Sequence, residues 1–231
     1  MNPDENQRSA PHRTAREARR RAFVARWRRL GETLRRSAAA YQEAARGVRA
    51  DLAAVGVDIE TVDALPRLGR TYPEAVPVLL HWLPVVENVD VKEDIVRALS
   101  VGFAKPAAAP LVLAFERAGD SPGLQWAIGN ALEVLASAEI ADAMLRLAGE
   151  RRHGRARQMV VAGLGKLKDP RVVDVLVGLL DDPEVAGHAI GALGQLRAHA
   201  AVPHLVPFLE HKSVWVRKMA QRALARLGRA P

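Results

Sequence analysis

Apolar residues recur at intervals of three and four in five similar segments of the chain. The segments cover residues 91–104, 123–136, 155–168, 184–197 and 215–228, and each has a leucine in the same register. These five anchor leucines, 29 to 33 residues apart, are Leu99, Leu132, Leu164, Leu193 and Leu224. Such spacing places apolar side chains on one face of an α-helix, so each segment is predicted to be an amphipathic helix.

A second amphipathic stretch precedes each of these segments, at residues 75–83, 108–116, 140–148, 172–180 and 201–209. Asp169-Pro170 and Asp182-Pro183 stand where helices are expected to start, since a carboxylate caps free N–H groups and proline suits the first helical position. The predicted repeat is a helix, a tight turn and a second helix. One pair cannot bury its apolar face alone, so neighbouring pairs must stack into an all-α solenoid of about five helical hairpins.

This period of about 31 residues, with its Asp-Pro joints and "AIGALGQL"-type second helices, resembles the HEAT-repeat family, in particular bacterial HEAT-like repeats. The resemblance covers about residues 71–228, and residues 169–197 are the closest unit. It implies a right-handed superhelix whose second helices line a concave surface. It also implies that a partner binds in that surface.

The first 70 residues follow a different pattern. Apolar residues from Val24 to Val55 alternate three and four apart, which predicts one long amphipathic helix with Gly56 as a stop. We expect residues 14–70, this Arg-rich helix and a connector, to cap the repeats of residues 71–231. A dimerising coiled coil is the alternative, but the Ala-rich seam favours a monomer. Residues 1–13 lack apolar periodicity and are expected to be a disordered basic tail.

Charge is distributed unevenly along the chain. Residues 1–50 hold 13 of the 34 basic and 5 of the 26 acidic residues, so residues 51–231 hold 21 of each. A basic segment attracts polyanions, which makes nucleic acid a candidate partner. The other interpretation is that these arginines only solvate exposed helix faces, because arginine outnumbers lysine 28 to 6 throughout the chain.

Several chemistries find no support in the sequence. The chain has no cysteine, which excludes disulfides and thiolate sites and fits the cytoplasm. The apolar run at residues 76–86 is too short to cross a membrane. His199 and His204 fall on different helix faces, so no metal site is predicted. The segment "GLGKL" lacks the remaining residues of a phosphate loop. We therefore expect neither an enzyme nor a cofactor.

The positions six and two before each anchor leucine, and one after it, lie opposite the apolar core stripe. We expect this stripe, with its basic flanks, to form the partner-binding groove. The candidate residues are Glu93, Arg97, Trp126, Asn130, Arg157, Gln158, Gly187, Gly191, Gly194, Arg217, Lys218 and Arg222.

Two features of this stripe suggest contact with a partner. Trp126 is a plausible anchor beside Asn130, although it could instead cover a neighbouring repeat. Glycine in a helix costs about 1 kcal/mol relative to alanine, so Gly187, Gly191 and Gly194 indicate that something approaches the backbone closely. That something is either a partner or the chain's own N-terminal helix near residues 38–45.

The leading hypothesis is a non-enzymatic adaptor that holds a partner helix or acidic peptide in the groove. The alternative is a nucleic-acid-binding protein, similar in layout to the HEAT-like alkylpurine DNA glycosylases. That resemblance implies a groove with tryptophan, arginine and an acidic residue. Here Asn130 follows Trp126 and Glu93 is the nearest acid on the stripe, and an amide cannot act as the carboxylate would.

Overall fold

The computed structural model describes residues 37–119 and 121–228. The predicted tail at residues 1–13, and the predicted long helix up to residue 36, lie outside the described residues. The chain divides into two compact units, residues 1–44 and 45–231. In the first unit the described residues 37–44 are helical and mostly exposed.

In the second unit, residues 45–54 form a helix that packs against the start of the array. Val48 and Leu52 are fully buried, as predicted for the apolar seam. Gly47 leaves room for the indole of Trp82, whose Nε1 donates a hydrogen bond to Asp51 at 2.8 Å. The helix ends where Gly56 takes a positive φ of 80°, and Val57 N–H closes the turn on the carbonyl of Leu52.

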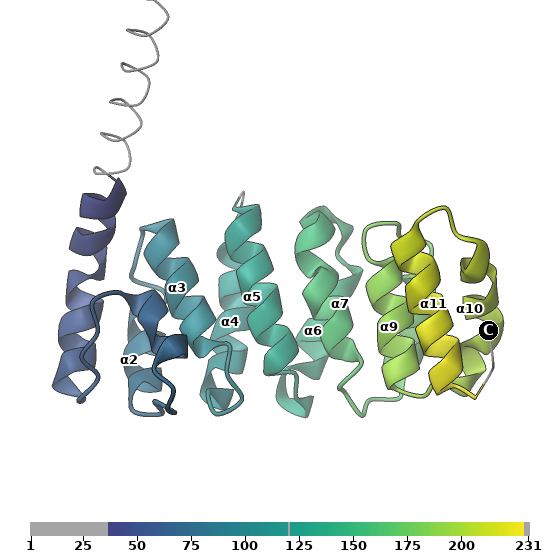
Figure 1. Cartoon of the computed structure of the whole chain (residues 1–231), viewed down its shortest axis with the longest axis horizontal. Coiled ribbons are helices and arrows are strands. Elements are labelled where there is room, and N and C mark those ends of the chain that lie inside the picture. Colours follow the sequence, from purple (N-terminus) through teal and green to yellow (C-terminus); the bar gives the residue numbers. More distant parts are fainter. Residues whose placement is uncertain (1–36, 120, 229–231) are drawn as a thin grey trace, which may run out of the picture. The chain divides into compact units, whose positions relative to one another are not determined.

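Ten helices follow in five consecutive pairs, which confirms the predicted all-α array (Figure 1). The pairs are α2 (Ala75–Trp82) with α3 (Val89–Leu99), α4 (Ala108–Arg117) with α5 (Pro122–Val134), α6 (Ala141–Gly149) with α7 (Gln158–Leu164), α8 (Arg171–Gly178) with α9 (Ala186–Gln195), and α10 (Val202–Leu205) with α11 (Val214–Arg226). No strand occurs among the described residues.

Short 3-10 helices modify the predicted elements. Three lead into first helices: η3 (Lys105–Ala107), η4 (Ala138–Ile140) and η6 (His199–Ala201). In the fifth pair α10 gives way to η7 (Val206–Glu210), because Pro207 has no N–H to continue the α-helix. In the third pair the predicted helix over residues 155–168 begins as η5 (Arg151–Arg157), and α7 starts only after it.

The core runs between the two layers of helices. All five anchor leucines are buried, as predicted: Leu99, Leu132, Leu164, Leu193 and Leu224. Burying one leucine side chain contributes roughly 1.5–3 kcal/mol, and the described core is mostly aliphatic, with Tyr72 and Phe115 as its buried aromatic rings. The stacking of pairs therefore depends on shape and apolar area.

The second helices α3, α5, α7, α9 and α11 lie in front of the first helices in Figure 1 and form one layer. We call this layer the second-helix face. Each helix contacts the next, from α3 and α5 to α9 and α11. The closest approaches use small residues. A Cβ added at Gly194 would lie 2.8 Å from Ala223 Cα, and one added at Gly165 would lie 2.9 Å from Ala192 Cα.

These contacts correct the prediction that a partner or the N-terminal helix approaches the three glycines of α9. Gly187 and Gly194 are buried, and the atoms closest to them belong to α11. A Cβ at Gly187 would overlap the ring of Trp215, and one at Gly191 would lie 2.7 Å from Met219 Cε. The close neighbour is thus the following second helix, α11.

Two glycine-to-alanine substitutions should have opposite effects on stability. Gly194→Ala is expected to lower the free energy of unfolding by about 1–3 kcal/mol, since its Cβ would press on the backbone of Ala223. Gly178→Ala, at the end of α8 where nothing lies within 4 Å, is expected to raise it by about 0.4–1 kcal/mol. Urea denaturation measures both, and the same sign for the two variants would contradict the packing described here.

Candidate functional site

An open groove lies at the first end of the second-helix face. Its volume is about 530 Å³. The short helix η2 (Val62–Arg67) lies beside α3, where a preceding second helix would otherwise lie, and α5 forms the other wall. The lining residues are Asp63, Pro66, Arg67, Asp94, Arg97, Ser100, Trp126, Ala127 and Asn130. We call this site the Trp126 groove.

The groove holds three of the residues singled out in the sequence, namely Arg97, Trp126 and Asn130. The side chain of Trp126 is 50% exposed, so a large part of its surface stays open to solvent. Asn130 Nδ2 donates to the carbonyl of Trp126 at 2.9 Å, which directs the amide toward its own helix. Trp126 is thus an apolar surface available to a partner.

Both arginines in the Trp126 groove are already paired. Arg67 binds Asp63 at 2.5 Å, and this hydrogen bond holds the pKa of Asp63 below its usual range. Arg97 binds Glu93 at 2.5 Å and Asp94 at 3.1 Å. The candidate residue Glu93 therefore acts as a partner of Arg97. The groove combines an aromatic surface with balanced charge.

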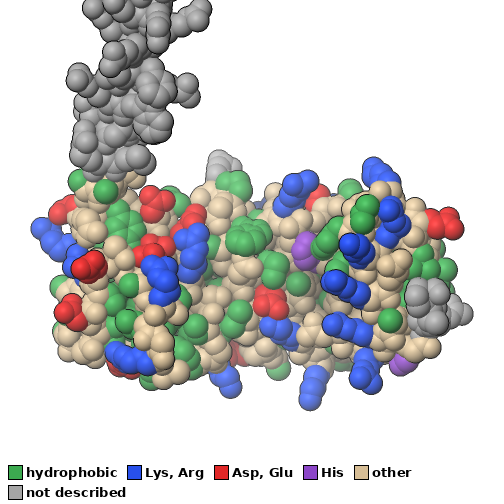
Figure 2. Space-filling view, viewed as in Figure 1, with side chains coloured by type: hydrophobic (Ala, Val, Ile, Leu, Met, Phe, Trp, Pro, Cys, Tyr) green, Lys and Arg blue, Asp and Glu red, His purple; other side chains and the backbone are tan. Residues whose placement is uncertain are grey.

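The opposite end of the second-helix face is basic. Lys218 and Arg222 on α11 are exposed and have no hydrogen bond or ion pair with any described residue. Arg217 is half-buried, and its Nη1 donates to the carbonyl of His211 at 2.6 Å. Lysine and arginine side chains gather at this end in Figure 2. Lys218 and Arg222 supply positive charge that no described carboxylate neutralises.

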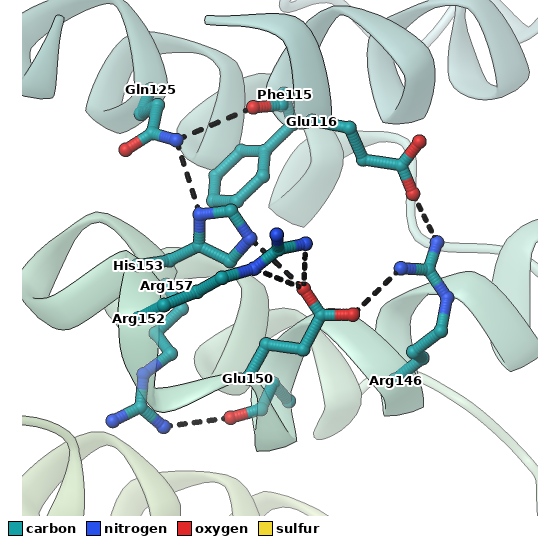
Figure 3. Close-up of polar contacts among 9 residues, drawn as sticks. Phe115, Glu116, Gln125, Arg146, Glu150, Arg152, His153 and Arg157 are labelled. Atoms are coloured by element: carbon teal, nitrogen blue, oxygen red, sulfur yellow. Dashed lines mark hydrogen bonds and ion pairs between the residues drawn. The ribbon is translucent and has the colours of Figure 1, made fainter. Parts of the chain in front are cut away.

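Arg157 does not line any surface, which corrects its place among the candidate groove residues. Its side chain is fully buried, and its Nη1 donates to the carbonyl of Ala148 at 2.8 Å (Figure 3). Its Nη2 binds the Asp182 carboxylate. Burial alone raises the pKa of Asp182, but Arg157 and the Glu184 N–H outweigh it and lower that pKa. Arg157 thereby joins the third pair to the fourth.

Gln158 also contributes to this joint. Its Nε2 donates to the carbonyl of Glu184 at 2.8 Å, just before α9 begins. The interaction is exposed and links two consecutive repeats through a backbone acceptor. Gln158 is therefore satisfied within the chain, although it remains at the surface.

An equivalent joint connects the second and third pairs. Gln125 and Arg157 each stand seven residues before an anchor leucine, and His153 and Asp182 each stand eleven before the next one. Gln125 Nε2 reaches the Phe115 carbonyl at 3.4 Å and His153 Nδ1 at 3.1 Å. The sequence did not predict these contacts. The signal that could have found them is the polar residue, Gln125 or Arg157, at the same place in two otherwise apolar helix faces.

Glu150 binds two arginines and a histidine beside the contact between Gln125 and His153, as Figure 3 shows. Its carboxylate is bound by Arg152 at 2.7 Å, Arg146 at 2.8 Å and His153 Nε2 at 3.0 Å. Because Gln125 donates to Nδ1 of His153, Nε2 carries the proton and donates to Glu150. These partners, with Arg152 the strongest, lower the pKa of Glu150 to about 2. The cluster fixes η5 against α6.

Residues 37–119 and 121–228 contain neither a metal-binding cluster nor a membrane-spanning helix. No group of three or more histidine, aspartate or glutamate side chains there is arranged to hold a metal ion. None of the described helices has the length and apolar character needed to cross a membrane.

Comparison with known families places the repeats. A family model described as HEAT repeats matches residues 108–184 and 181–231, which together make up more than half of the chain. These residues contain α4 to α11, and thus both polar joints and the basic end of the second-helix face. A search of curated proteins finds no match.

Acid is expected to weaken the fold partly through Glu150. Its folded pKa of about 2 lies below the ordinary 4.5, so its stabilising contribution is fully present above pH 4.5 and is lost as the pH falls through 2. Glu150→Gln should flatten this part of the stability profile, measured by chemical denaturation at each pH. The exposed Glu139→Gln is the control. Equal profiles for wild type and Glu150→Gln would contradict the assignment.

The buried joint predicts a non-additive pair of substitutions. Asp182→Asn should lower the free energy of unfolding by about 3 kcal/mol, because Arg157 is left charged and buried without its counter-ion. Replacing both residues by leucine should recover most of this loss. Denaturation of the single and double variants gives the coupling energy. A double variant that loses the sum of both single effects would refute the pairing.

Proposed function

The chain belongs to the HEAT-repeat family, and on this premise we propose that it is a non-enzymatic adaptor that holds a partner protein's helix or acidic peptide on the second-helix face. HEAT repeats generally mediate protein interactions. A partner helix suits this face, because parallel second helices leave shallow grooves that accept apolar residues at intervals of three and four.

The exposure of Trp126 is the observation that carries the proposal. Tryptophan is enriched at interaction hot spots, where its large apolar surface is removed from water by a partner. Half of this side chain is open in a groove of about 530 Å³, which has room for apolar anchor side chains of a helix.

The basic end of the face favours an acidic partner. Lys218 and Arg222 form no ion pair with a described carboxylate, so an incoming carboxylate displaces no such pair there. Such charges at the rim of an interface mainly raise the association rate and select the orientation of the partner. Trp126 would anchor the partner, and α11 would orient it.

Nucleic acid fits the described surface less well. A phosphate backbone crossing the Trp126 groove would meet the carboxylates of Asp63 and Asp94 beside the arginines. Arginines that are already neutralised by carboxylates neutralise few phosphates, so few counter-ions leave the nucleic acid and the main source of its affinity is lost. Asn130 is also turned to its own backbone and presents no carboxylate for catalysis.

Affinity purification followed by mass spectrometry tests this function. The intact protein, immobilised and treated with nuclease, should retain a partner from the native host. Trp126→Ala should raise the Kd for that partner by at least about 30-fold, the effect of losing a hot spot worth about 2 kcal/mol. Its own stability should change by less than about 0.5 kcal/mol, because the side chain is half exposed.

Val206→Ala is the matched control, since Val206 is an exposed apolar residue of η7 and lies outside the Trp126 groove. It should retain the partner. Retention by Trp126→Ala, or loss of all bound protein after nuclease treatment, would rule out the proposed adaptor role.

A further inference from the structure

A second open groove lies among the first helices. Its volume is about 500 Å³, and it separates α2 from α4 where α3 and α5 begin. Leu80 of α2, Leu113 of α4 and Leu124 of α5 belong to its lining. We call this site the α2/α4 groove. It shares no lining residue with the Trp126 groove.

The lining is aliphatic apart from three polar residues. Leucine, valine, proline and alanine make up the apolar part, and Leu113 remains 51% exposed. The polar residues are Lys92, Arg117 and Ser121. An apolar concavity with a few polar groups is the usual composition of a small-molecule site, and its volume falls within the usual range.

The described charged residues of this groove are both cations. Lys92 and Arg117 have no hydrogen bond or ion pair with a described residue, and no described carboxylate belongs to the lining. Lys92 is also half-buried. A partly desolvated ammonium without a counter-ion gains more from an incoming anion than an exposed one, because water screens it less.

Comparison of the repeats shows that Lys92 lacks the carboxylate that its counterpart Arg157 has. Lys92 stands seven residues before its anchor leucine and Ser121 eleven before the next, so they occupy the positions of Arg157 and Asp182. In that later joint the cation is neutralised by a buried carboxylate. Between the first and second pairs the residue that corresponds to Asp182 is Ser121, and a hydroxyl cannot supply the negative charge.

We propose that the α2/α4 groove binds an aliphatic monocarboxylate of the fatty-acid type, with its carboxylate at Lys92 and Arg117 and its chain along the leucines. An extended peptide fits less well, because its backbone N–H and C=O groups would face aliphatic side chains without partners. The chain's own N-terminal segment is rich in arginine and would meet two cations. An alkyl chain meets neither obstacle.

Calorimetry with decanoate on the full chain tests the proposal. Decanoate, kept below the concentration at which it forms micelles, should bind with a stoichiometry of one. Decylammonium carries the same chain with the opposite charge and should bind at least about tenfold more weakly, since one charge-assisted interaction is worth about 1.5 kcal/mol. Decanol, which has the chain without the charge, should also bind more weakly.

Variants assign the binding to this groove. Lys92→Met keeps the length of the side chain and removes its charge, and it should raise the Kd for decanoate about tenfold. Lys92→Arg should restore binding. Arg117→Gln changes an exposed residue, so it should leave the fold intact and also raise the Kd for decanoate. Leu113→Asn should raise the Kd because it removes an apolar contact of the alkyl chain.

Lys218→Met is the matched control, because Lys218 is an unpaired lysine outside the groove, and it should leave the Kd unchanged. Trp126→Ala should leave it unchanged too, so this test is independent of the adaptor proposal. Absence of saturable decanoate binding, equal binding of decylammonium, or an unaltered Kd in both Lys92→Met and Arg117→Gln would overturn the assignment.

Discussion

The structure depends on one constraint: a pair of helices of this length cannot bury its own apolar face, so each pair is stable only against its neighbours. Every other feature follows from how closely the pairs approach. The anchor leucines occupy the space between the two layers, and the second helices meet through glycine and alanine. Any side chain at Gly194, alanine included, would press α9 away from α11, because the obstacle there is backbone.

Polar contacts act on this apolar scaffold by fixing the registration between pairs. Arg157 and Gln125 each connect a carbonyl of one first helix to a residue between the two helices of the next pair. A buried ion pair contributes little net stability, since desolvation offsets its attraction, but it penalises any registration that leaves the charge alone. The polar contacts of Arg157 and Gln125 therefore account for how specifically the pairs stack more than for how stable the stack is.

Function must then lie where stacking leaves groups unsatisfied. On the second-helix stripe, the glycines of α9 lie against the next helix, α11. Trp126 at one end remains exposed, and at the other end Lys218 and Arg222 have no ion pair with a described residue. On the first-helix side, the α2/α4 groove combines exposed leucine with Lys92. These surfaces bind partners through groups that the repeats themselves do not use.

The sequence by itself determined the helical pairs, their number and the buried face, because a period of three and four residues directly reports which side of a helix avoids water. It also located Gly56 as a helix end. Only the tertiary structure decided what the opposite side meets. A small residue at Gly187 looks the same whether a ligand or the helix α11 lies against it, and the charge of Arg157 does not reveal a partner 25 residues away. Periodicity describes one helix at a time, whereas exposure depends on the distance between helices, and that distance is set by side chains from different repeats packing together.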